Sequence, residues 1–168
     1  MSRITLSLST LVVALAACGG KPEQSAGKPD STPAAAAAAT PATAAAPGAD
    51  AYQICATCHQ ANGEGLPNAF PPLAGSDIVN GPVEPHIAIV LKGMSGPVVV
   101  KGQAFNGVMA AWESLPDEQI AAAINYERAS WGNSGKPVTV QDVAAVRAAV
   151  KSRATAWTIE DLKKAKLR

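Results

Sequence analysis

The feature that most constrains this chain is a pair of cysteines followed at once by a histidine, in the pentapeptide Cys55-Ala56-Thr57-Cys58-His59. Thiols at this spacing lie on one helical turn, where they can form thioethers with the two vinyl groups of a single porphyrin. The imidazole of the next residue then lies beneath the iron. The motif therefore predicts one covalent haem c per chain, attached through Cys55 and Cys58 and ligated by His59.

Other interpretations of the motif remain open at this point. A thioredoxin-like redox pair has the same C-x-x-C spacing, but it expects alternating strands and helices nearby, and no such pattern surrounds the motif. A zinc site needs four ligands, whereas the motif supplies three and the chain has one further histidine, His86. The motif could also arise by chance, although the N-terminal segment and the downstream sequence weigh against this.

The first 17 residues have the composition of an export signal. Arg3 provides a basic start, an apolar stretch runs from Leu6 to Ala17, and Leu15-Ala16-Ala17-Cys18 ends it. The pattern resembles a bacterial lipoprotein signal, in which cleavage before Cys18 leaves a cysteine that carries acyl chains. An uncleaved membrane helix is the alternative, but the apolar run is shorter than the about 20 residues that span a bilayer. We therefore expect removal of residues 1–17 and lipidation of Cys18.

A lipidated Cys18 predicts a location in the bacterial cell envelope, on the periplasmic side. Gly19 follows this cysteine, which favours the outer membrane under the sorting rule of Gram-negative lipoproteins. The three cysteines of the chain are then all assigned, one to lipid and two to haem, so that none is left for a disulfide. Haem attachment to cysteines also takes place after export, in an oxidising compartment. The two motifs therefore support each other.

Residues 18–48 are rich in alanine, proline, threonine, serine and glycine, and they have almost no large apolar side chain. Such a segment cannot bury enough surface to fold, and its alanine run at 34–39 is too short to persist as an isolated helix. We expect a disordered tether with a reach of roughly 30 Å. A haem domain at 49–135 would then move freely near the membrane.

Hydrophobic periodicity after the tether predicts a mainly α domain. We expect three core helices: one that is capped by Asp50 and carries the cysteines, one from Pro85 to Gly93, and one after Pro116. The glycines and prolines of 63–75 exclude regular structure there, and residues 98–100 could form a small extended ribbon. Little other strand is expected.

Several stretches of this sequence resemble the class I c-type cytochromes of the bacterial periplasm. Besides the attachment motif, the matching stretches are Phe70–Ser76, Phe105–Trp112, Asp117–Tyr126 and Ser130–Asn133. The resemblance covers residues 49–133. It implies the class I cytochrome c fold, with three core helices and loops around one covalent haem. It also implies one-electron transfer by Fe(III)/Fe(II) cycling, without chemistry on a substrate.

The resemblance further implies which residue is the sixth ligand of the iron. In this family it is a methionine just before the last core helix, which here is Met109. Met94 is the competitor, and either methionine could simply pack in the core. Thioether sulfur favours the reduced iron and raises the potential. The family usually has proline after this methionine, whereas this chain has Ala110, which is expected to soften the loop.

Other crevice roles also follow from the resemblance. The carbonyl of Pro71 is expected to accept a hydrogen bond from the imidazole of the proximal histidine, which orients the ring. Leu73 and Trp112 are expected to line the haem crevice. His86 could be a second imidazole ligand, but a surface position is expected because the methionine loop already offers a ligand. Glu127 replaces an aliphatic residue on the last core helix and is expected to pair with a neighbour or tilt outward.

Residues 136–168 form a basic extension, with eight basic and three acidic residues, whereas Asp50 to Gly135 have three basic and eight acidic residues. Thr139 is expected to cap a helix with a valine stripe, and a second short helix is expected near 157–162. This extension could pack on its own acidic core or on a partner subunit, and opposed charges could also steer redox partners. No nucleic-acid binding is expected, since the basic residues lack interleaved aromatic side chains.

The N-terminal signal and the cytochrome resemblance together imply a lipid-anchored electron carrier, whose redox donor and acceptor the sequence does not identify. An alternative is a fixed haem subunit of a larger membrane or periplasmic oxidoreductase complex. A third is a haem enzyme or gas sensor with an open iron position. Peroxidases of this kind usually carry two haem motifs and this chain has one, which disfavours the third alternative.

Overall fold

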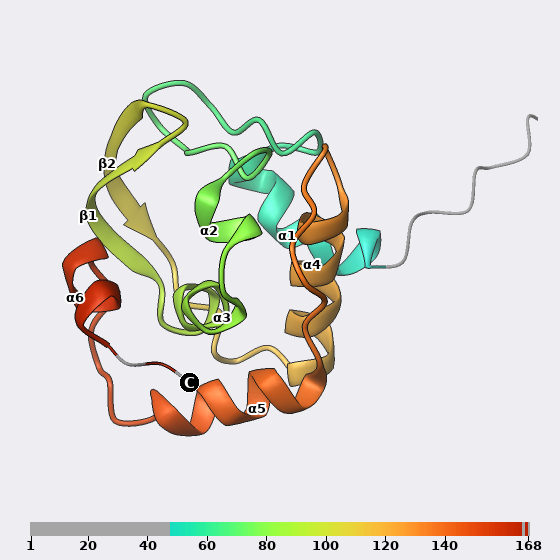
Figure 1. The fold of residues 1–168 in the computed structure, drawn as a ribbon, viewed down its shortest axis with the longest axis vertical. Helices are drawn as coiled ribbons and strands as arrows, with labels where there is room; N and C mark the ends of the chain where they lie inside the picture. Colours follow the sequence, from blue (N-terminus) through green and yellow to red (C-terminus); the bar gives the residue numbers. More distant parts are fainter. Residues whose placement is uncertain (1–47, 166, 168) are drawn as a thin grey trace, which may run out of the picture. The chain divides into compact units, whose positions relative to one another are not determined.

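The computed structural model describes residues 48–165 and residue 167 (Figure 1). The expected signal segment at 1–17, Cys18 and the tether up to residue 47 lie outside the described residues. The described part contains helices α1 (Ala49–His59), α2 (Asp77–Asn80), α3 (Val83–Lys92), α4 (Asp117–Ala129), α5 (Val140–Ala149) and α6 (Ile159–Lys164), and strands β1 (Met94–Val100) and β2 (Gln103–Met109). None of these helices is long and apolar enough to cross a membrane.

Helix α1, which carries the cysteine motif, packs against α4 (Figure 1). Gly48 precedes it at φ 87°, and a Cβ at this position would collide with the carbonyl oxygen of Ala122, so only glycine allows this approach. Tyr52, Tyr126 and Trp131 pack together at the contact, with ring centroids 5.1 to 5.6 Å apart. Asp50, the expected cap, instead lies in the first turn, where its charge still favours the helix dipole.

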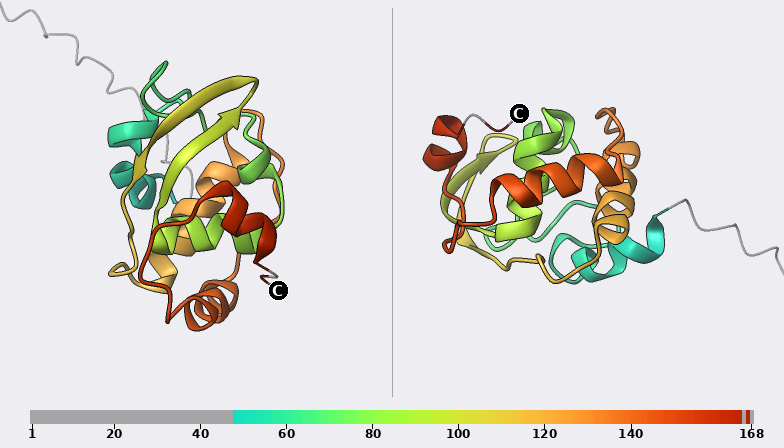
Figure 2. Two further views of the ribbon diagram at one scale, coloured as in Figure 1. Left: turned by 90° about the vertical axis from the view of Figure 1, so that its left-hand side faces the viewer. Right: turned by 90° about the horizontal axis from the view of Figure 1, so that it is seen from below.

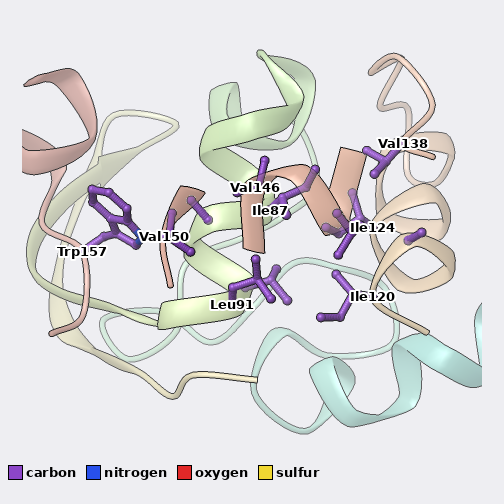
Figure 3. Close-up of a cluster of buried hydrophobic side chains, with 12 residues drawn as sticks. Ile87, Leu91, Ile120, Ile124, Val138, Val146, Val150 and Trp157 are labelled. Atoms are coloured by element: carbon purple, nitrogen blue, oxygen red, sulfur yellow. The ribbon is translucent and has the colours of Figure 1, made fainter. Parts of the chain in front are cut away.

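Helix α3 lies at the centre of the main hydrophobic core, in which Ile87 and Leu91 are fully buried (Figure 3). Ile120 and Ile124 of α4 pack against it from one side, and the valine stripe of α5 packs from another. The helix begins at Val83, two residues before the expected Pro85, and it ends at Gly93 as expected. Proline is tolerated within a first turn because its missing N–H would have no helical partner there.

The strands form an antiparallel hairpin much longer than the ribbon expected at 98–100. Residues 94–100 pair with 103–109, and Lys101 and Gly102 form the two-residue turn with φ of 51° and 78°. Positive φ at both turn positions matches the twist of paired strands. A strand is recognised in a sequence by the alternation of apolar and polar residues. Glycine and proline interrupt this alternation on β1, and glycine interrupts it on β2, which explains why the hydrophobic pattern predicted so little strand.

The basic extension packs on the acidic core of its own chain, which is one of the two arrangements expected for it. Helix α5 begins with the expected Thr139 cap, in a capping box with Asp142, and it lies against α3 and α4 (Figure 2). Arg147 of α5 pairs with Asp117 of α4 at 2.7 Å. Trp157 then joins the extension to the hairpin, since Ser95 N–H donates to its carbonyl at 2.7 Å. Part of the basic charge therefore neutralises the acidic core in cis.

Candidate haem site

A large apolar pocket lies between α1, α3, α4, the hairpin and the loop that follows α1. Aliphatic and aromatic side chains dominate its lining, and the polar side chains are few and come from separate elements. Leu73 and Trp112, the expected crevice residues, both line it. Such an apolar cavity with few polar groups is typical of a cofactor site.

The cysteine motif lies at the wall of this pocket. Cys55, Cys58 and His59 all line it, and α1 ends at His59. Nδ1 of His59 lies 2.9 Å from the carbonyl oxygen of Pro71, which is the hydrogen bond expected between these two residues. A carbonyl can only accept, so Nδ1 carries the proton and Nε2 keeps a free lone pair with which to bind a metal. The buried ring is thereby held in one tautomer and one orientation.

A close backbone approach at Gly65 and the hydrogen bonds of Asn133 hold the loop that carries Pro71. Gly65, at φ 64°, lets the chain turn so closely that a Cβ there would collide with the carbonyl oxygen of Phe70. Asn133, buried after α4, accepts from Gly75 N–H at 2.8 Å and donates to the Leu73 carbonyl at 3.1 Å. The acceptor of the His59 proton is therefore fixed by contacts far apart in the sequence.

The two candidate methionine ligands lie together on the hairpin. Met94 begins β1, Met109 ends β2, and the two residues are paired directly opposite each other. Both line the pocket. Directly opposite residues of an antiparallel pair project from the same face of the sheet. The pairing brings both sulfur atoms to the same region, and the choice of Met109 as the ligand stays a prediction.

The pocket face of the hairpin has room for a flat macrocycle. Gly96 and Gly107 are paired opposite each other, two positions from the methionines, and both line the pocket. A Cβ built on Gly96 would meet no atom within 4 Å, and one on Gly107 would meet only the Ala69 carbonyl oxygen, at 3.9 Å. The absence of side chains at this pair leaves a cradle in the pocket that the attachment cysteines also line. The residues present therefore fit a haem.

Two ionisable residues lie buried in the pocket wall, and sequence reasoning placed one of them, His86, wrongly. His86, expected at the surface, is only 4% exposed, because it lies on the inner side of α3. Glu127 was expected to pair with a neighbour or to tilt outward, and the pairing is confirmed, since its carboxylate lies 2.9 Å from the ring of His86. Burial and then the nearby Glu127 carboxylate raise the pKa of the Cys55 thiol to about 12. The departure of Glu127 from the aliphatic pattern was the signal that could have found this pair.

We expect that filling the glycine cradle blocks haem binding. A Gly107→Leu substitution places a side chain in the pocket, so the haem content per polypeptide should fall at least several-fold. The ratio of Soret absorbance to protein concentration measures this. Asn106→Leu is the matched control, because Asn106 is exposed on the same strand and does not line the pocket. Equal haem content in the two variants would contradict this position for the macrocycle.

The zinc interpretation finds no further ligands in the described part of the chain. Within it, no group of three or more histidine, cysteine, aspartate or glutamate side chains is arranged to hold a metal ion.

Comparison with known proteins gives relatives of one kind. The profile of the cytochrome c family matches residues 45–131. A cytochrome c-552 of Thermus thermophilus is 44% identical over 114 residues, which cover 62% of this chain and 77% of that protein. The cytochrome c subunit of a quinone alcohol dehydrogenase from Gluconacetobacter polyoxogenes is 36% identical over 113 residues, 62% of this chain and 23% of that protein. The gluconate 2-dehydrogenase cytochrome c subunit of Pantoea cypripedii is 36% identical over 104 residues, 60% and 24% respectively.

Proposed function

Since this chain belongs to the cytochrome c family, we propose that it is a one-electron carrier in a bacterial electron-transfer chain, with haem c as its cofactor. When bound, the haem supplies an iron that cycles between Fe(III) and Fe(II). The protein holds this group and exchanges electrons, and it does not act on a substrate.

We assign roles to the site residues on the same basis. Cys55 and Cys58 attach the haem, His59 ligates the iron through Nε2, and Met109 ligates it from the hairpin. The observation that carries this assignment is the hydrogen bond at 2.9 Å from His59 Nδ1 to the Pro71 carbonyl, which leaves Nε2 free inside the apolar pocket. The apolar residues that the hairpin contributes to the pocket would limit the access of water to a bound haem, which would disfavour the charged ferric state and raise the potential.

Spectroscopy of the purified haem-bearing protein tests this function. We expect a mass that exceeds the polypeptide by one haem, reversible one-electron reduction, and a weak far-red band in the oxidised protein that marks sulfur on ferric iron. Rapid carbon monoxide binding to the reduced form, with no such band, would instead favour a haem enzyme or gas sensor with an open iron position. Colourless mature protein would contradict the proposal altogether.

We also propose that Cys18 is lipidated after cleavage of residues 1–17, and that residues 18–48 tether the haem domain on the periplasmic side of the envelope. The motif Leu15-Ala16-Ala17-Cys18 and the composition of the tether support this. Labelled palmitate should be incorporated into the wild type and not into a Cys18→Ser variant. Membrane fractionation on a density gradient separates the outer membrane, favoured by Gly19, from the inner membrane.

A second candidate is a fixed haem subunit of a larger oxidoreductase complex. It is favoured by the relatives that are cytochrome subunits of dehydrogenases, although this chain spans less than a quarter of their length. Purification of the tagged protein from its native membrane separates the two candidates. Other subunits should accompany it in constant ratio if it is a fixed subunit, and it should come alone if it is a free carrier.

A further inference from the structure

The pocket wall contains a buried pair of ionisable side chains that electron transfer as such does not need. Glu127 on α4 and His86 on α3 are 3% and 4% exposed, and both line the pocket. Oε2 of Glu127 lies 2.9 Å from Nε2 of His86, which is ion-pair distance. The N–H of the His86 ring is not aligned on that oxygen. Among the described residues, neither Oε2 of Glu127 nor Nδ1 of His86 has a hydrogen-bond partner.

The apolar surroundings of the pair make its charge important, because they solvate an uncompensated charge poorly. An unpaired carboxylate in an apolar pocket is costly, whereas a carboxylate beside an imidazolium is compensated. When the imidazole binds a second proton and becomes imidazolium, the pair is neutral, and when the imidazole is neutral, the pair carries one net negative charge. Loss or gain of a single proton therefore changes the charge of the pocket wall by a full unit.

The pair also lies close to the proposed haem attachment point. The Glu127 carboxylate acts on the thiol of Cys55 and, after burial, contributes most to the raised pKa of that thiol. A thioether at Cys55 has no proton to donate. In the haem-bearing protein this thiol therefore no longer titrates beside Glu127, and the side chain at ion-pair distance from the carboxylate is His86.

We propose that the Glu127–His86 pair takes up a proton when the protein is reduced and releases it when the protein is oxidised. This inference rests on the proposed function. In the reduction step, one electron from the donor converts Fe(III) to Fe(II), and one proton from water binds His86, which turns neutral imidazole beside carboxylate into imidazolium beside carboxylate. Oxidation returns the electron to the acceptor and the proton to water.

Electrostatics gives the direction in which the reduction potential changes with pH. Reduction makes the haem site more negative by one charge, and at short range in a medium of low dielectric constant this tightens proton binding at the pair. Because protons bind the reduced form more tightly, the reduction potential falls as pH rises through the range in which the pair titrates. If reduction tightens proton binding tenfold, the potentials below and above that range differ by about 59 mV.

Other ionisable groups lie around the pair, and several of them already have partners of their own. Tyr52 and Cys55 face it from α1, Arg128 adjoins Glu127 on α4, and Glu84 lies on the first turn of α3 and acts on Arg128. The guanidinium of Arg128 is already held by the carbonyl oxygens of Lys136 and Gly81. From the remaining packed elements, α2 contributes Asp77, and α5 contributes Arg147, which pairs with Asp117 at the opposite end of α4.

The test compares the pH dependence of the reduction potential in three haem-bearing proteins: the wild type, Glu127→Gln and Glu118→Gln. Glutamine keeps the shape of Glu127 and removes its charge. Glu118 is the matched control, since it is exposed in the first turn of the same helix. We expect a falling potential over one titration range in the wild type and Glu118→Gln, and a flat potential over that range in Glu127→Gln. His86→Gln should flatten it as well.

Proton uptake is measured directly with a pH indicator in weakly buffered solution as the wild type is reduced. We expect a fraction of one proton per electron, with a maximum within the same titration range. Wild-type reduction without proton uptake would refute the coupling. Unchanged pH dependence in Glu127→Gln would assign the coupling to another group, such as the haem propionates, and would also refute the proposal. In both cases normal haem content and reversible reduction would leave the proposed function intact.

Discussion

A variant with both Cys55→Ala and Cys58→Ala is expected to lose the covalent haem and most of its stable structure. The pocket walls come from α1, α3, α4 and the hairpin, so each of these elements turns an apolar side toward the space that the cofactor would fill. A macrocycle in this space buries apolar surface worth about 25 cal/mol per Å², and its loss leaves that surface exposed to water. Total stability of a small domain is only about 5–15 kcal/mol, so we expect largely unfolded protein at 37 °C.

Haem staining after denaturing electrophoresis and thermal unfolding followed by circular dichroism measure this effect. Thr57→Ala is the matched control, because Thr57 lies between the cysteines, is exposed and does not line the pocket. It should keep the stain and the unfolding temperature of the wild type. A double cysteine variant that unfolds cooperatively at the wild-type temperature would show that the protein core alone holds the fold.

The second large effect is expected at the iron. Met109→Ala should abolish the far-red sulfur band, allow carbon monoxide to bind the reduced form, and lower the reduction potential. Axial ligands span a range of about 0.8 V across haem proteins, and we expect a fall of a few tenths of a volt when the thioether is lost. Absorption spectra and spectroelectrochemistry at one fixed pH measure these changes.

Met94→Leu is the natural control for the methionine variant. Leucine keeps the volume of Met94 but has no sulfur, and Met94 is paired directly opposite Met109. We expect the band and the potential of Met94→Leu to stay close to those of the wild type. If Met94→Leu loses the band and Met109→Ala keeps it, then Met94 is the ligand and our assignment is wrong.

Local sequence signals predicted the elements that depend on neighbouring residues. The Cys55 to His59 motif on a helix, the Thr139 cap of α5 and the stop of α3 at Gly93 all depend on spacing within a turn or two. The contact between His59 and Pro71 came from a family resemblance, since nothing in their spacing specifies it. The hairpin was underestimated because the glycines that make room beside its pocket face also remove the alternation that marks a strand.

By itself the amino-acid sequence determined the cofactor chemistry and the helical class, because covalent attachment and helix periodicity are set by residues close together in the chain. Tertiary structure alone decided that the basic extension covers α3 and α4 of its own chain, that the two methionines lie opposite each other, and that His86 meets Glu127 inside the pocket. These contacts join residues on different elements. Whether a side chain is buried depends on which elements pack over it, and spacing along the chain does not carry that information.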